Sequence, residues 1–131
     1  MSRHDRFRTP LKRARGLGSA KDGTHHWIVQ RITAIALVFL SIYVIGLVVW
    51  LLGADFVTVR AAVAHPLNAV VLVAFLIATF WHSQLGMQVI IEDYVHTPWL
   101  AVTAQLAVIF VCILAALASV LAVVRIALFG A

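Results

Sequence analysis

One histidine, His82, stands deep inside the apolar stretch between Leu67 and Ile91. An imidazole in hydrocarbon costs free energy unless its ring nitrogens are satisfied. A hydrogen bond to a Ser, a Thr or a carbonyl of a neighbouring helix would satisfy one, and haem iron is a second possibility because neutral imidazole is a preferred axial ligand. Gly86 follows on the same helical face, where its missing side chain leaves room for a flat macrocycle or a close helix. Both interpretations stay open on these residues alone. The chain has no second histidine at such depth, so a haem with two histidine ligands needs another chain.

Two polar residues, Asp93 and Tyr94, end the same apolar stretch. Asp93 follows His82 by close to three helical turns, so the two residues share a face and lie roughly 16 Å apart along the axis. A phenol at the membrane edge is a suitable hydrogen-bond donor to a quinone carbonyl, and a carboxylate beside it can orient it or relay protons. The simpler alternative is an interfacial tyrosine next to a solvated acid.

His25 and Arg31 lie near the start of the first apolar stretch. Arg31 is costly inside lipid unless it meets an anion. A haem propionate would supply that anion, and the positive N-terminal end of the helix adds to the attraction. Snorkelling to the interface is the alternative. His26 is adjacent to His25 and is expected to point elsewhere, without a role.

The elements that must position these residues are long apolar runs. The chain has 131 residues, of which 63% are hydrophobic and 11% are charged, and its mean hydropathy is +1.03. A soluble domain of this size needs more charge, and barrel strands would alternate apolar and polar residues. Three runs, 28–52, 67–91 and 98–129, are each long enough to cross the membrane as a helix, and a turn of interfacial helix is expected around 56–60. The predicted fold class is an all-α integral membrane protein with three transmembrane helices, which forms part of a multi-subunit helix bundle.

Two regions are expected along the chain: a basic N-terminal cytoplasmic segment, residues 1–22, and a three-helix membrane anchor domain, residues 23–131. Thr24 is a plausible N-cap of the first helix. Pro66 and Pro98 suit the first turns of the second and third helices, because proline lacks the N–H that a first turn leaves unpaired.

The net charge of +5 is distributed unevenly along the chain. Beyond the first apolar run the only basic residues are Arg60 and Arg125. By the positive-inside rule, this places the N-terminus in the cytoplasm and the C-terminus in the periplasm. The basic segment also favours anionic lipid headgroups, and nucleic acid is not expected as a partner. The other eight basic residues precede or open the first run: Arg3, Arg6, Arg8, Lys12, Arg13, Arg15, Lys21 and Arg31.

Other kinds of chemistry have little basis in the sequence. Cys112 is the single cysteine, so an internal disulfide and a thiolate metal cluster are excluded. No nucleotide-binding glycine loop, zinc motif or nucleophile–base pair is present, and catalysis by this chain alone is not expected. His4, His65 and His96 are assigned no role.

An ordered set of residues resembles a known family. The chain is similar to the small hydrophobic membrane-anchor subunits of succinate dehydrogenase (respiratory complex II), of the cytochrome b556 type. The likeness covers about residues 16–129 and leaves the basic segment Met1–Arg15 outside. The matching residues are Gly23-Thr24-His25, Arg31-Ile32-Thr33-Ala34-Ile35, His82, Gly86 and Asp93-Tyr94-Val95.

The resemblance implies a role for each candidate site residue. His82 corresponds to the axial ligand of haem b iron, and the second ligand comes from a partner membrane-anchor cytochrome b subunit. Tyr94 corresponds to the ubiquinone-binding tyrosine, with Asp93 beside it. Arg31 lies near the haem propionates, with His25 in their vicinity.

The resemblance also implies an activity and partners. The chain would anchor succinate dehydrogenase in a bacterial inner membrane, or in a mitochondrial-type inner membrane. A flavoprotein subunit and an iron–sulfur subunit would pass electrons from succinate oxidation to ubiquinone, the substrate. Three alternatives are a structural anchor without haem, a fumarate reductase anchor subunit, and a small channel or transporter subunit.

Overall fold

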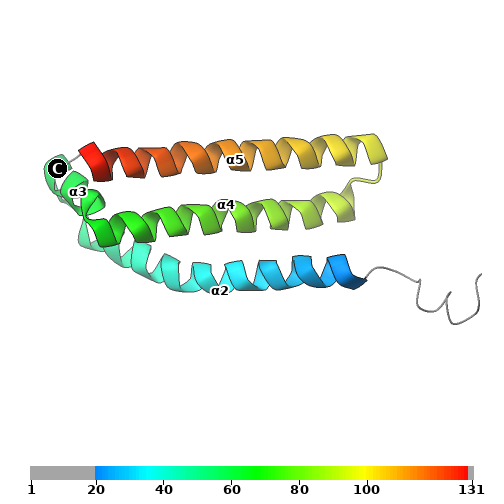
Figure 1. The fold of residues 1–131 in the computed structure, drawn as a ribbon, viewed down its shortest axis with the longest axis horizontal. Coiled ribbons are helices and arrows are strands. Elements are labelled where there is room, and N and C mark those ends of the chain that lie inside the picture. The colour runs from blue at the N-terminus through cyan, green and yellow to red at the C-terminus, as the bar shows by residue number, and fades with distance from the viewer. Residues whose placement is uncertain (1–19, 130–131) are drawn as a thin grey trace, which may run out of the picture.

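The computed structural model describes residues 20–129 of the protein, with side chains from Thr24 onward. This range is helical apart from short connections and contains no strand, so the all-α prediction is confirmed. The helices are α2 (Ala20–Trp50), α3 (Phe56–Ala64), α4 (Pro66–Tyr94) and α5 (Pro98–Phe129) (Figure 1).

Three of these helices are long and apolar enough to cross a membrane. The candidate spans are Thr24–Trp50, Pro66–Tyr94 and Pro98–Phe129, of 27, 29 and 32 residues. At about 1.5 Å per residue they measure about 40–48 Å, more than the roughly 30 Å of bilayer hydrocarbon. Their ends therefore reach the interfaces or the helices tilt. The protein is a multi-pass membrane protein.

The long helices lie side by side as a single layer with α4 in the middle (Figure 1). α4 packs against both α2 and α5, whereas α2 and α5 do not touch each other anywhere in residues 20–129. α3 packs across one end of the layer, against α4 and α5. Both faces of this layer are open. Only four side chains of the described part are buried: Thr33, Ala69, Leu85 and Ile91.

The connection from α2 to α4 depends on local backbone chemistry. Gly53 has a φ of +82°, a conformation that a side chain would strain. Asp55 caps the N-terminus of α3, where its carboxylate accepts a hydrogen bond from the Thr58 N–H at 3.0 Å. Hydrogen bonds from the Thr58 side chain and backbone hold the pKa of Asp55 below its usual value. His65 then ends α3, and Pro66 occupies the first turn of α4 as expected.

The helix boundaries differ from the predicted ones at several points. α2 begins at Ala20, so the expected division between residues 22 and 23 falls inside it, and Thr24 is within the helix rather than its N-cap. Gly23 costs about 1 kcal/mol in a helix interior, but the strong helix formers Ala20 and Lys21 precede it. α3 is a nine-residue helix rather than a single turn. Most of the predicted basic segment lies outside the described residues.

Candidate functional site

His82 contacts α2 through a single hydrogen bond. Its Nδ1 atom lies 3.0 Å from the Thr33 Oγ1 atom. Thr33 is 9% exposed, and its hydroxyl also lies 3.0 Å from the Val29 carbonyl and 3.1 Å from the Gln30 carbonyl of its own helix. The helix–helix hydrogen bond that was one alternative for His82 is therefore present.

This hydrogen bond occupies only one of the two ring nitrogens. A threonine hydroxyl has one proton, and when that proton is directed to the α2 carbonyls the oxygen accepts from the Nδ1–H of His82. The neutral imidazole then carries its lone pair on Nε2. A ring oriented in this way through its other nitrogen is the usual arrangement of a metal-binding histidine.

Arg31 and His82 line the same pocket, of about 340 Å³, at the junction of α2 and α4. The guanidinium carbon of Arg31 lies 5.5 Å from the centroid of the Trp27 ring, at cation–π distance. Arg31 is exposed and its charge is available to an anion on the open face of the layer. Gln30 and Ala34 complete the pocket.

Gly86, one helical turn beyond His82, borders open space. A Cβ atom added at this position would meet no heavy atom within 4 Å outside its own helix. Within the described chain, then, no neighbouring helix uses the gap that the missing side chain leaves. The space beside Gly86 is available to a ligand or to a helix of another chain.

The structure separates the two adjacent histidines of α2. His25 is exposed and does not line the His82 pocket. His26 is half-buried, and its Nε2 atom is buried without a hydrogen-bond partner in the described residues. Sequence reasoning assigned His26 no role, although it precedes the α4-contacting Thr33 by two helical turns and so shares its face.

Asp93 and Tyr94 are the last two residues of α4, and both are exposed. The Tyr94 side chain is 77% exposed. Its hydroxyl has no hydrogen-bond partner among residues 20–129. The Nδ1 atom of His96 lies 3.1 Å from the backbone carbonyl oxygen of Tyr94 and does not contact the hydroxyl through a hydrogen bond. The structure thus leaves a free phenol at the end of the helix that carries His82.

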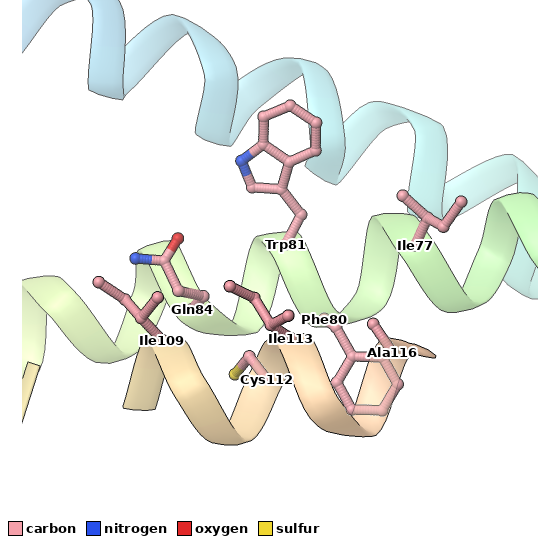
Figure 2. Close-up of a pocket in the computed structure, with 8 residues that line it drawn as sticks. All are labelled: Ile77, Phe80, Trp81, Gln84, Ile109, Cys112, Ile113 and Ala116. Atoms are coloured by element: carbon pink, nitrogen blue, oxygen red, sulfur yellow. The ribbon is translucent and has the colours of Figure 1, made fainter. Parts of the chain in front are cut away.

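A second pocket, of about 320 Å³, lies between α4 and α5 (Figure 2). Its walls are apolar apart from Gln84 of α4 and Cys112 of α5. In the part of the chain that the structure describes, no group of three or more His, Cys, Asp or Glu side chains could hold a metal ion. The largely apolar lining of this pocket suits an apolar chain.

A pair of hydrogen bonds at the opposite end of α4 was missed by sequence reasoning. Tyr43 of α2 donates its hydroxyl proton to the Asn68 side-chain oxygen at 2.6 Å. The Asn68 amide donates in turn to the Ala62 carbonyl of α3 at 2.7 Å. The available signal was a tyrosine inside one apolar run and an asparagine at the entry to the next.

The fold and the site define a three-span helical membrane protein with an oriented histidine and a cationic pocket on an open face. Residues 5–122 match the family described as succinate dehydrogenase/fumarate reductase transmembrane subunit, and the chain belongs to this family. The match begins within the basic segment, earlier than the expected start near residue 16.

Several relatives carry the name succinate dehydrogenase hydrophobic membrane anchor subunit. The protein of Rickettsia bellii (strain RML369-C) is 38% identical over 117 residues, which cover 89% of this chain and 94% of the relative. That of Rickettsia conorii (strain ATCC VR-613 / Malish 7) is 33% identical, covering 88% and 93%. That of Paracoccus denitrificans is 34% identical over 90 residues, covering 68% and 69%. No solved structure matches the chain significantly. The resemblance to these anchor subunits is thereby confirmed.

Proposed function

We propose that this chain anchors succinate dehydrogenase in the membrane, holds one side of a haem b, and forms part of the ubiquinone-reduction site. The observation that carries the haem proposal is the contact between His82 Nδ1 and Thr33 Oγ1 at 3.0 Å. When the Thr33 oxygen accepts from the Nδ1–H of His82, the lone pair is on Nε2, which is the state that iron requires of an imidazole. When bound, the haem supplies a one-electron carrier beside the quinone site.

The surroundings of His82 fit such a group. Arg31 lines the same pocket and can pair with a propionate, which would offset the cost of a guanidinium in the membrane. Gly86 borders open space on the following turn, where a flat ring needs room. The site is one-sided, because the described chain offers no second histidine in the middle of a span. A second membrane-anchor cytochrome b subunit would supply the other ligand.

The quinone site would lie at the end of α4. Tyr94 has a free hydroxyl that can donate to a quinone carbonyl, and Asp93 beside it can orient the phenol or relay a proton. His82 and Asp93 are roughly 16 Å apart along the helix axis. Electrons would reach the quinone from an iron–sulfur subunit, itself reduced by a flavoprotein subunit that oxidises succinate.

The orientation in the membrane follows from charge. The start of α2 and the connection between α4 and α5 lie at the same end of the layer (Figure 1). The basic segment precedes α2, so the positive-inside rule places this end, with Tyr94, on the cytoplasmic side of a bacterial inner membrane. Three spans then place the C-terminus in the periplasm.

The proposal is tested with a reduced-minus-oxidised spectrum of the purified complex. We expect a b-type α-band that is lost in a His82→Ala complex, because no other side chain of the described residues replaces the ligand. His65→Ala, an exposed histidine at the far end of α4, is the matched control and should keep the band. A complex without this band, or a band indifferent to His82→Ala, would identify the chain as a haem-free structural anchor.

A further inference from the structure

A groove between α3 and α5 lies at the end of the layer away from Tyr94. Its volume is about 640 Å³. Arg60 of α3 and Arg125 of α5 both line it. The remaining walls are apolar and consist of Phe56, Val59, Val63, Ala122, Ile126 and Phe129. We call this feature the arginine groove.

The two arginines carry charge that the described chain does not neutralise. Arg60 donates from Nη2 to the Phe129 carbonyl at 3.2 Å, which leaves its other N–H groups free. Arg125 has no hydrogen-bond or ion-pair partner in residues 20–129. Among the described residues, the only acidic side chain near this end is Asp55, whose carboxylate accepts a hydrogen bond from the N–H of Thr58 at the start of α3. The groove therefore has a net cationic rim.

The groove lies at the end of a candidate membrane span, where the boundary between headgroups and hydrocarbon is expected. Arg125 precedes the end of α5 at Phe129 by four residues, or about 6 Å along the axis, so its guanidinium can reach the headgroup layer. Phe56 and Phe129 are 77% and 76% exposed, which places aromatic surface at the mouth of the groove. Apolar walls lie beneath the charges.

We propose that the arginine groove binds an anionic phospholipid, with the phosphate between Arg60 and Arg125 and an acyl chain along the apolar walls. Guanidinium groups form charge-assisted hydrogen bonds with phosphate oxygens. An amphiphile satisfies both halves of the groove at once, whereas an acidic protein segment would satisfy only the charges. Arg60 and Arg125 are also the only basic residues beyond Arg31, so this end of the chain has no other strong anion attractor.

The test uses the complete purified complex in nanodiscs of phosphatidylcholine with a minor fraction of phosphatidylglycerol. Native mass spectrometry counts the phosphatidylglycerol molecules that each complex retains. In Arg60→Gln/Arg125→Gln, we expect the affinity of one retained site to fall by roughly fivefold for each arginine. Arg60→Lys/Arg125→Lys should keep most of the binding, since the charge remains. Arg3→Gln/Arg6→Gln removes the same charge from the basic segment, which attracts anionic lipid by charge alone, and should leave the affinity of this one retained site unchanged.

A second variant tests the apolar half without touching the charges. Ala122→Trp should fill the wall between α3 and α5 and lower phosphatidylglycerol retention, while both arginines remain. The proposal is overturned if the glutamine variant retains phosphatidylglycerol as well as the unaltered complex, or if phosphatidylcholine is retained equally. Loss of another subunit from the glutamine variant, with lipid retention unchanged, would instead make the groove a protein-binding surface.

Discussion

The two tyrosines of the chain lie toward opposite ends of the helical layer and differ in exposure and in hydrogen bonding. Tyr43 is 38% exposed and its hydroxyl is bonded to Asn68, which in turn reaches α3. Tyr94 is 77% exposed, and its hydroxyl has no partner in the part of the chain that the structure describes. The Tyr43 hydroxyl thus links α2 to α4, whereas the Tyr94 hydroxyl is available to hydrogen-bond a ligand or another chain.

The same contrast extends to the neighbouring polar groups. At the Tyr43 end, Asn68 links two helices and bonds both its oxygen and its nitrogen within the chain. At the Tyr94 end, Arg31 faces an open pocket and Nε2 of His82 is left without a bond when Thr33 takes Nδ1. Because an unpaired polar group is costly in a membrane, the second end requires ligands or other chains to complete it. At the first end, Tyr43 and Asn68 are paired within the chain, and Arg60 and Arg125 are the charged groups left to an external anion.

The largest effect is expected from Thr33→Val, which would sharpen the contrast by removing the internal partner of His82. Loss of the group that orients a metal-bound histidine typically costs about 10–100-fold in affinity. Haem retained per complex during dilution or competition measures this loss. Thr33→Ser should retain haem because it keeps the hydroxyl.

Thr79→Val is the matched control for that substitution. The Thr79 hydroxyl donates to the Phe75 carbonyl of its own helix, at 2.7 Å, and has no hydrogen bond to another span within the described residues. Its replacement should leave haem retention unchanged. Equal losses in the Thr33 and Thr79 variants would mean that the hydroxyl of Thr33 does not orient His82.

Tyr94→Phe should lower quinone reductase activity by about tenfold, the effect of losing one hydrogen bond worth roughly 1.5 kcal/mol. The haem spectrum and the melting temperature should not change, because the hydroxyl has no partner within the described chain. Activity is assayed with succinate and a soluble quinone. An unaltered rate would remove Tyr94 from the proposed quinone site.

Tyr43→Phe should have the smallest effect, on stability alone. The substitution removes the hydroxyl that donates to Asn68 at 2.6 Å, at a cost of about 0.5–1.5 kcal/mol. Thermal denaturation of the complex should show a lower melting temperature with quinone reductase activity retained. If Tyr43→Phe reduces activity as strongly as Tyr94→Phe, the proposed division between the two ends is wrong.

The sequence by itself determined the elements and the residues worth testing. Long apolar runs must form helices in a membrane, because every backbone N–H and C=O group has to be paired without water. The three spans therefore follow from composition, and Pro66 and Pro98 mark the starts of two helices correctly. A histidine and an arginine in such runs are costly, which singled out His82 and Arg31 without knowledge of their neighbours.

The tertiary structure alone decided which residues meet. In a helix that is apolar on all sides, no single face is marked for packing against a particular neighbouring helix. The sequence therefore does not show that α4 lies between α2 and α5. The partner of His82 is Thr33, 49 positions away, and the partner of Tyr43 is 25 positions away. Arg60 and Arg125 line one groove only because α3 packs across α5. Such contacts arise from close packing between whole helices, which no local pattern of residues encodes.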